Sequence, residues 1–122
     1  MFAGNAEEAM NFYISLFPGA EVLGIVRYGP NGPGAEGSVM KASFRIGTQT
    51  MLCTESTVKH DFSFTSAFPF FVECESEDEI RRLHQALVAG GTASMFSASY
   101  GFGRMFARVN DRYGVPWQLN LP

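Results

Sequence analysis

Apolar side chains recur at every third or fourth position in two segments of the chain, residues 5–16 and residues 76–87. The positions on this spacing are all apolar apart from one histidine: Ala9, Phe12, Tyr13, Leu16, Ile80, Leu83, His84 and Leu87. Such spacing is typical of helices that bury one face. The sequence therefore predicts two amphipathic helices.

The two predicted helices carry the same start and stop signals. In each, a small polar residue precedes an acidic residue by three positions, Asn5 before Glu8 and Ser76 before Glu79, which is the pattern of a helix cap. Helix-ending residues follow both segments, Pro18-Gly19 and Gly90-Gly91. Because the segments align residue for residue, we interpret the chain as an internal duplication.

Short apolar runs predict three strands after each helix. They cover residues 21–28, 39–46 and 50–54 in the first half, and 92–96, 105–110 and 115–121 in the second. A further strand, residues 68–74, precedes the second helix. Its counterpart in the first half would end at Phe2 or Ala3, so we expect that first strand to begin before Met1. Residues 29–37 are rich in glycine and proline and predict a loop.

Each half therefore follows a βαβββ order, and we expect an α+β fold of two tandem βαβββ modules. The modules would cover residues 1–56 and 68–122, joined by a linker at 57–67. A helix covers one face of a curled, mixed sheet and leaves the other face free. Pairing two such sheets would enclose an apolar trough with the helices outside. Concave apolar surfaces of this kind favour small molecules.

Composition narrows the classes of function. The chain has 122 residues, the size of a single domain, and a net charge of −3 without a basic stripe, which argues against nucleic-acid binding. No apolar run is long enough to span a bilayer and no signal peptide is visible, so we expect a cytoplasmic protein without a membrane partner. Cys53 and Cys74 lie in apolar strands and lack CxxC spacing, so we expect reduced, buried and inert thiols.

Twelve phenylalanines exceed what the core of so small a protein needs, so we expect some of them to line the trough or a subunit interface. Tyr100 and Gln118 are the polar groups best placed to orient a ligand there. The predicted ligand-binding residues are Phe44, Met51, Phe62, Phe64, Phe70, Tyr100, Trp117 and Gln118. His60 alternates with Phe62 and Phe64 and is a candidate general base or ligand-orienting donor; the alternative is a surface histidine in the linker.

Several motifs resemble one known family. They are residues 3–9, 11–18, 36–39, 60–65, 71–75, 90–91 and 111–118. Together they are similar to PhnB-like proteins, the 3-demethylubiquinone-9 3-methyltransferase domain family of the glyoxalase/vicinal oxygen chelate superfamily. The resemblance implies the paired βαβββ modules shared by glyoxalases, bleomycin resistance proteins and dihydroxybiphenyl dioxygenases, and a homodimer. It leaves function open, because that superfamily includes isomerases, dioxygenases, thiol transferases and metal-free binding proteins.

The resemblance also raises the question of a cofactor. Metal-using relatives end their last strand in Asp-x-x-Gly-x-x-x-Glu, and here Gln118 stands where the carboxylate would be. Glu55 is the other weak candidate for a metal ligand, while Phe68 and Pro69 stand where the first strand would supply one. Catalytic metals need about three protein ligands, so a divalent metal is open but not favoured.

Methyl transfer would need a binding site for S-adenosylmethionine (SAM). A glycine-rich turn between a strand and a helix usually holds such a donor. The nearest match, Gly101-Phe102-Gly103, lies between predicted strands. The favoured hypothesis is therefore a protein that binds a small apolar or aromatic molecule. The alternative is a divalent-metal-dependent lyase, isomerase or dioxygenase, and the methyltransferase is less favoured.

Overall fold

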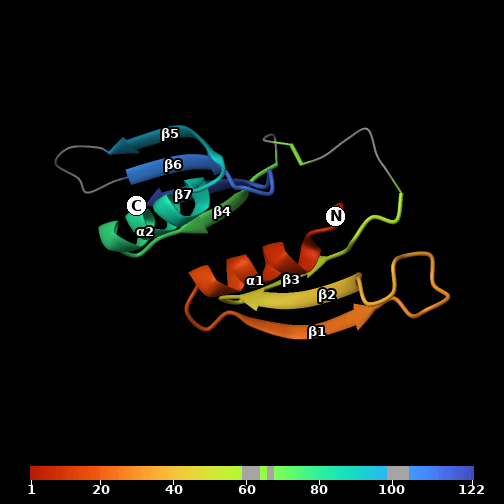
Figure 1. Cartoon of the computed structure of the whole chain (residues 1–122). Helices are drawn as coiled ribbons and strands as arrows, with labels where there is room; N and C mark the ends of the chain where they lie inside the picture. The colour runs from red at the N-terminus through yellow and green to blue at the C-terminus, as the bar shows by residue number, and fades with distance from the viewer. Residues whose placement is uncertain (59–63, 66–67, 99–104) are drawn as a thin grey trace. The chain divides into compact units, whose positions relative to one another are not determined.

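The computed structural model describes residues 1–58, 64–65, 68–98 and 105–122. The chain divides into two compact units, Met1–Asp61 (unit 1) and Phe62–Pro122 (unit 2), which Figure 1 shows in red to yellow-green and in green to blue. The predicted modules, residues 1–56 and 68–122, fall one in each unit.

Unit 1 consists of a helix and a three-stranded antiparallel sheet. The helix α1 (Ala6–Leu16) precedes β1 (Glu21–Arg27), β2 (Val39–Ile46) and β3 (Gln49–Cys53), and the strand order is β1-β2-β3. The helix packs against β2 on one face of the sheet (Figure 1).

Unit 2 repeats this arrangement and adds one strand before its helix. Its elements are β4 (Phe70–Glu73), α2 (Glu77–Val88), β5 (Thr92–Ala98), β6 (Met105–Asn110) and β7 (Pro116–Leu121). The sheet order is β4-β7-β6-β5, with β4 parallel to β7 and the other pairs antiparallel. The helix α2 packs against β6 and β7. The βαβββ order predicted for the second half is confirmed, and no helix among the described residues is long and apolar enough to cross a membrane.

The start of the chain occupies the place that the duplication predicts. Phe2 forms a parallel bridge with Glu55: its N–H donates to the carbonyl of Thr54 at 2.8 Å, and its carbonyl accepts from the N–H of Ser56 at 2.7 Å. This bridge is the counterpart of the parallel pairing of β4 with β7 in unit 2. The two units therefore share one topology.

The two helices are capped differently. Ser76 is extended and its Oγ accepts from the N–H of Glu79 at 3.1 Å, as predicted. Asn5 makes no capping bond of this kind among the described residues, so that part of the prediction is wrong. Its backbone is not extended (φ −133°, ψ 26°), and the carboxylate of Glu55 instead accepts from the N–H of Ala6.

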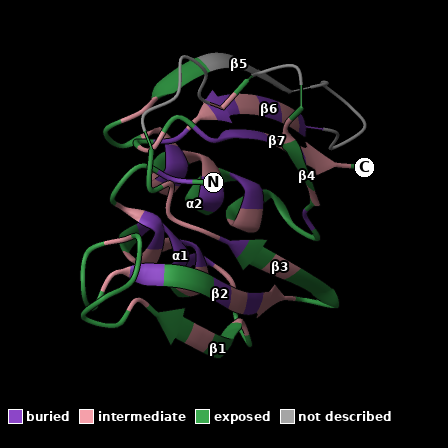
Figure 2. Ribbon diagram, turned by 90° about the vertical axis from the view of Figure 1, so that its right-hand side faces the viewer, coloured by how far each residue is buried: buried purple, intermediate pink, exposed green. Residues whose placement is uncertain are grey.

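The helices bury the faces that cover their sheets (Figure 2). On α2 the buried side chains are Ile80, Leu83 and Leu87, as predicted. On α1 the buried face is turned slightly from the predicted one, because Met10 is buried and Phe12 is only half-buried. Phe12 lies against Tyr13 with ring centroids 5.7 Å apart.

Candidate functional site

The sheet of unit 2 has two unlike faces. The face toward α2 is formed by buried side chains, Ala107, Val109, Trp117 and Leu119 among them. Strand alternation places the neighbouring residues on the opposite face. We call this surface the open face of unit 2, and its residues are Phe71, Glu73, Phe106, Arg108, Gln118 and Asn120. Its side chains are half-buried on β6 and β7 and exposed on β4.

A polar pair lies at the centre of the open face. Arg108 and Gln118 are directly opposite each other on β6 and β7. In the orientation that satisfies both groups, the amide oxygen of Gln118 accepts from Nε of Arg108 at 3.3 Å and from its Nη2. The guanidinium is therefore positioned by a neutral amide.

Two phenylalanines flank this pair. Phe71 on β4 is in register with Gln118 and is 56% exposed. Phe106 precedes Arg108 by two positions on β6 and is half-buried on the same face. The open face thus combines apolar rings with a cluster of N–H donors, which is the combination that orients a small molecule.

Two of the predicted ligand-binding residues lie on opposite faces of the sheet of unit 2. Gln118 lies on the open face, whereas its neighbour Trp117 is 1% exposed on the face toward α2. The Trp117 ring packs against Phe70 with centroids 5.0 Å apart. In unit 1, Phe44 is buried and lies opposite the half-buried Met51.

Of the remaining predicted ligand-binding residues, the structure describes Phe64, which is half-buried. His60, Phe62 and Tyr100 lie outside the described residues. Neither Arg108 nor Phe71 was predicted to contribute to a site. The signal that could have found Arg108 was the hairpin of residues 105–110 with 115–121, whose register sets Arg108 opposite Gln118.

The described residues do not fit a catalytic metal. They contain no group of three or more His, Cys, Asp or Glu side chains that could hold an ion. Of the two candidate ligands, Glu55 caps α1 and Gln118 accepts from a guanidinium, whose positive charge repels a divalent cation. Neither position offers the cluster of oxygen ligands that hard cations require.

The two cysteines are buried, as predicted, and both are free thiols. Burial raises the pKa of Cys53, and it raises the pKa of Cys74 to about 11. A thiol with a raised pKa stays protonated at neutral pH and is a poor nucleophile. Covalent catalysis by either cysteine is therefore not supported.

Unit 1 contains a hollow beside the loop between β1 and β2. It has a volume of 560 Å³, and its lining includes Tyr28, Pro33, Gly34, Glu55 and Val58. Gly34 packs directly on the Tyr28 ring, because a side-chain carbon at position 34 would lie 2.5 Å from two ring carbons. The sequence predicted the loop but not the hollow.

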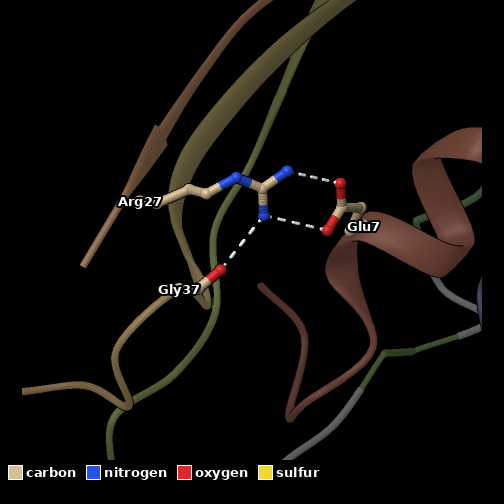
Figure 3. Close-up of polar contacts among 3 residues, drawn as sticks. All are labelled: Glu7, Arg27 and Gly37. Carbon is tan, nitrogen blue, oxygen red and sulfur yellow. Dashed lines mark hydrogen bonds and ion pairs between the residues drawn. The ribbon is translucent and has the colours of Figure 1, made fainter. Parts of the chain in front are cut away.

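Arg27 fixes both ends of this loop region to α1. Its Nη1 and Nη2 donate to the two carboxylate oxygens of Glu7 at 3.0 and 2.6 Å, and Nη1 also donates to the carbonyl of Gly37 at 3.1 Å (Figure 3). The hydrogen bond from Arg27 holds the pKa of Glu7 below its usual value. Both side chains are about half exposed, so this contact positions the loop more than it stabilises the fold.

Comparison with known proteins agrees with the fold described above and identifies the family of this chain. The family model described as 3-demethylubiquinone-9 3-methyltransferase matches residues 1–120. A crystal structure described as a putative 3-demethylubiquinone-9 3-methyltransferase, PhnB protein, from Bacillus cereus is 48% identical; the match covers 100% of this chain and 95% of that one, with a TM-score of 0.93. Protein YjdN of Escherichia coli is 25% identical over 98% of this chain and 90% of its own length.

A more distant structure shows the fold alone. The glyoxalase family protein from Enterococcus faecalis is 20% identical, with a TM-score of 0.59, and the match covers 97% of this chain and 90% of that one. Its similarity agrees with the repeated topology of units 1 and 2. The chain belongs to the 3-demethylubiquinone-9 3-methyltransferase family, whose PhnB-like members have the glyoxalase, or vicinal oxygen chelate, fold.

Proposed function

We propose that this protein binds a small molecule with an apolar or aromatic body on the open face of unit 2, and that binding needs no resident metal. The observation that carries the proposal is the exposed Phe71 beside the Arg108–Gln118 pair. An exposed aromatic side chain next to a positioned donor is typical of a binding surface. Because the fold hosts many chemistries, the proposal depends on these residues and not on the family name.

The two alternative activities have less support. A metal-dependent lyase, isomerase or dioxygenase would need a ligand set that the described residues do not supply. Methyl transfer, the activity in the family's name, would need a site for the donor. The turn that joins the strand β4 to the helix α2 consists of Cys74, Glu75 and Ser76 and has no glycine.

We also propose that the chain forms a homodimer. Large apolar side chains are exposed on the strands of unit 1, among them Leu23, Val26, Met40 and Leu52, which is 63% exposed. Figure 2 colours most of β1 as exposed. Exposed apolar side chains of this kind favour association. Light scattering during gel filtration tests it: a monomer at micromolar concentration would contradict the proposal.

Binding is tested with the purified full chain and a panel of small aromatic and aliphatic molecules. Thermal shift identifies the molecules that bind, and calorimetry gives their affinity with and without a chelator. We expect Phe71→Ala and Phe106→Ala each to weaken binding about tenfold, the loss expected for one aromatic contact. Phe68→Ala is the matched control, because Phe68 is 83% exposed and precedes β4.

Two results would contradict the proposal. One is binding that Phe71→Ala and Phe106→Ala leave unchanged, because the ligand would then lie elsewhere. The other is affinity that disappears when a chelator is added, because a metal would then be part of the site.

A further inference from the structure

We infer that Asn31 is a site of spontaneous covalent modification, where the asparagine is converted into a mixture of isoaspartate and aspartate. The reaction concerns the loop between β1 and β2 of unit 1 and does not depend on ligand binding at the open face of unit 2. It follows from the residue after Asn31, from the exposure of its side chain and from the weak hydrogen bonding of this turn.

The residue after an asparagine decides how easily the backbone reaches its side chain. Asn31 precedes Gly32, whereas the other asparagines of the chain, Asn5, Asn11, Asn110 and Asn120, precede residues with a side chain. Glycine leaves its backbone nitrogen accessible and allows the widest range of φ and ψ angles. Asn31 is therefore the asparagine whose Cγ the next backbone nitrogen attacks most readily.

Asn31 lies in a turn that is exposed and weakly held. Its side chain is exposed and makes no hydrogen bond with the described residues. The N–H of Gly32 donates to the carbonyl of Gly29 at 3.3 Å, which is longer than a usual backbone hydrogen bond. The turn lies between β1 and β2, so Asn31 can rotate toward the attacking geometry by breaking this weak bond and without breaking strand pairing.

Asn11 provides the contrast within the same unit. It is exposed as well, but it lies inside α1, where hydrogen bonds along the helix fix the backbone. The next residue, Phe12, is also bulky. Exposure alone therefore does not distinguish Asn31 from Asn11, whereas the turn and the glycine do.

The reaction balances with water as its co-reactant. The backbone nitrogen of Gly32, after losing its proton to hydroxide, attacks Cγ of Asn31; a C–N bond forms, and the side-chain nitrogen leaves as ammonia. The product is a succinimide ring. Water then adds to one of the two ring carbonyls and opens the ring. The chain continues through the original backbone carbonyl in aspartate and through the side-chain carbonyl in isoaspartate.

Isoaspartate should change the packing of the loop. The Tyr28 ring lies close to two glycines of the loop: an added side-chain carbon would lie 3.2 Å from a ring carbon at Gly32 and 2.5 Å at Gly34. Isoaspartate lengthens the backbone before Gly32 by one methylene group, which displaces these glycines from the ring. Because Pro33 and Gly34 line the hollow of unit 1, its wall should change as well. Aspartate keeps the original backbone.

The test follows the full chain during incubation at physiological temperature and mildly alkaline pH. Peptide mapping by mass spectrometry measures the loss of each asparagine, and enzymatic methylation detects isoaspartate. We expect loss of Asn31 while Asn11 stays intact, with the mass change for replacement of an NH₂ group by an OH group. The loss should be faster at higher pH, because the deprotonated nitrogen attacks.

Three variants test the route. Asn31→Gln should stop the change at this position, because the larger ring forms much more slowly. Gly32→Ala should slow the loss of Asn31, because the added methyl group hinders the attacking nitrogen. Asn11→Gln is the matched control and should leave the loss of Asn31 unchanged. Circular dichroism shows that each variant is folded.

The possible outcomes are distinct. Equal loss of Asn31 and Asn11 would overturn the inference, and so would a loss of Asn31 that yields aspartate alone, because direct hydrolysis gives no isoaspartate. NMR tests the effect on the loop. The amide signals of Gly32 and Gly34 in the incubated chain should include a set absent from Asn31→Asp, which gains the charge without the longer backbone. Identical spectra would overturn the predicted change in the loop.

Discussion

The carboxylate of Asp111 accepts the indole N–H of Trp117 at 2.9 Å, across the turn that joins β6 to β7. Its other oxygen accepts from the backbone N–H groups of Tyr113 and Val115 at 2.8 and 3.0 Å. Asp111 is only 3% exposed. One buried carboxylate therefore sets both the turn and the orientation of Trp117, and with it the register that brings Arg108 opposite Gln118.

Asp111→Ala should destabilise the protein strongly. It removes the acceptor of three N–H donors, and leaving them unsatisfied in a buried turn should cost about 3 kcal/mol or more of unfolding free energy. Urea unfolding followed by the fluorescence of the single tryptophan measures this loss. Asp78→Ala in the exposed first turn of α2 is the control and should cost well under 1 kcal/mol. Equal losses in the two variants would contradict this role for Asp111.

The caps of the two helices should respond differently to alanine. Ser76→Ala should lower the free energy of unfolding by about 1 kcal/mol, because it removes the acceptor for the N–H of Glu79. Glu55→Ala should cost at least as much, since Glu55 caps α1 in place of Asn5. Asn5→Ala should have a much smaller effect in the same urea titrations. A cost for Asn5→Ala equal to that of Ser76→Ala would show that Asn5 is the cap in solution.

Gly34→Ala should disturb the loop of unit 1. The added carbon would overlap the Tyr28 ring, and overpacking of this kind costs about 1–3 kcal/mol. Gly29→Ala is the control, because no described atom lies within 4 Å of the position its side chain would take. Thermal unfolding of both variants, and of Gly34→Ala combined with Tyr28→Ala, checks the prediction. A double variant no more stable than Gly34→Ala would show that the ring is not the obstacle.

Protonation of His84 should oppose folding. Burial lowers the pKa of His84 below its ordinary value of 6.5, so between the folded and unfolded pKa values the unfolded chain binds more protons. Its contribution to stability is therefore present above pH 6.5 and is lost as the pH falls toward the folded pKa. His84→Tyr, which copies Tyr13 in the other repeat, should lose less stability than the wild-type chain between pH 7.5 and 5.5 in urea titrations. Identical pH dependence would contradict the prediction, since His60 is present in both.

The elements of this fold were predictable because their signals are local. Apolar spacing and glycine-containing turns predicted both helices. The predicted strand ranges 39–46 and 105–110 coincide with β2 and β6. The duplication predicted a strand that ends at Phe2 or Ala3, and Phe2 forms a parallel bridge that corresponds to the pairing of β4 with β7.

The site was harder to predict because it depends on pairing between distant segments. Trp117 and Gln118 are adjacent in sequence and were expected to share a site, but alternation places them on opposite faces. Glu55 caps a helix that begins 49 residues earlier, which no local pattern indicates. Arg108 is a candidate site residue because it lies opposite Gln118, and that pairing depends on the strand register, which the sequence alone does not fix.

The most direct test of the account is to locate the bound ligand by NMR. The panel molecule with the highest affinity is titrated into the ¹⁵N-labelled full chain, and amide shift changes are mapped on the sequence. We predict the largest changes at Phe71, Phe106, Arg108 and Gln118, on β4, β6 and β7. Changes concentrated instead around Tyr28, Gly34 and Val58, the hollow of unit 1, would contradict the assignment of the open face of unit 2 as the binding surface.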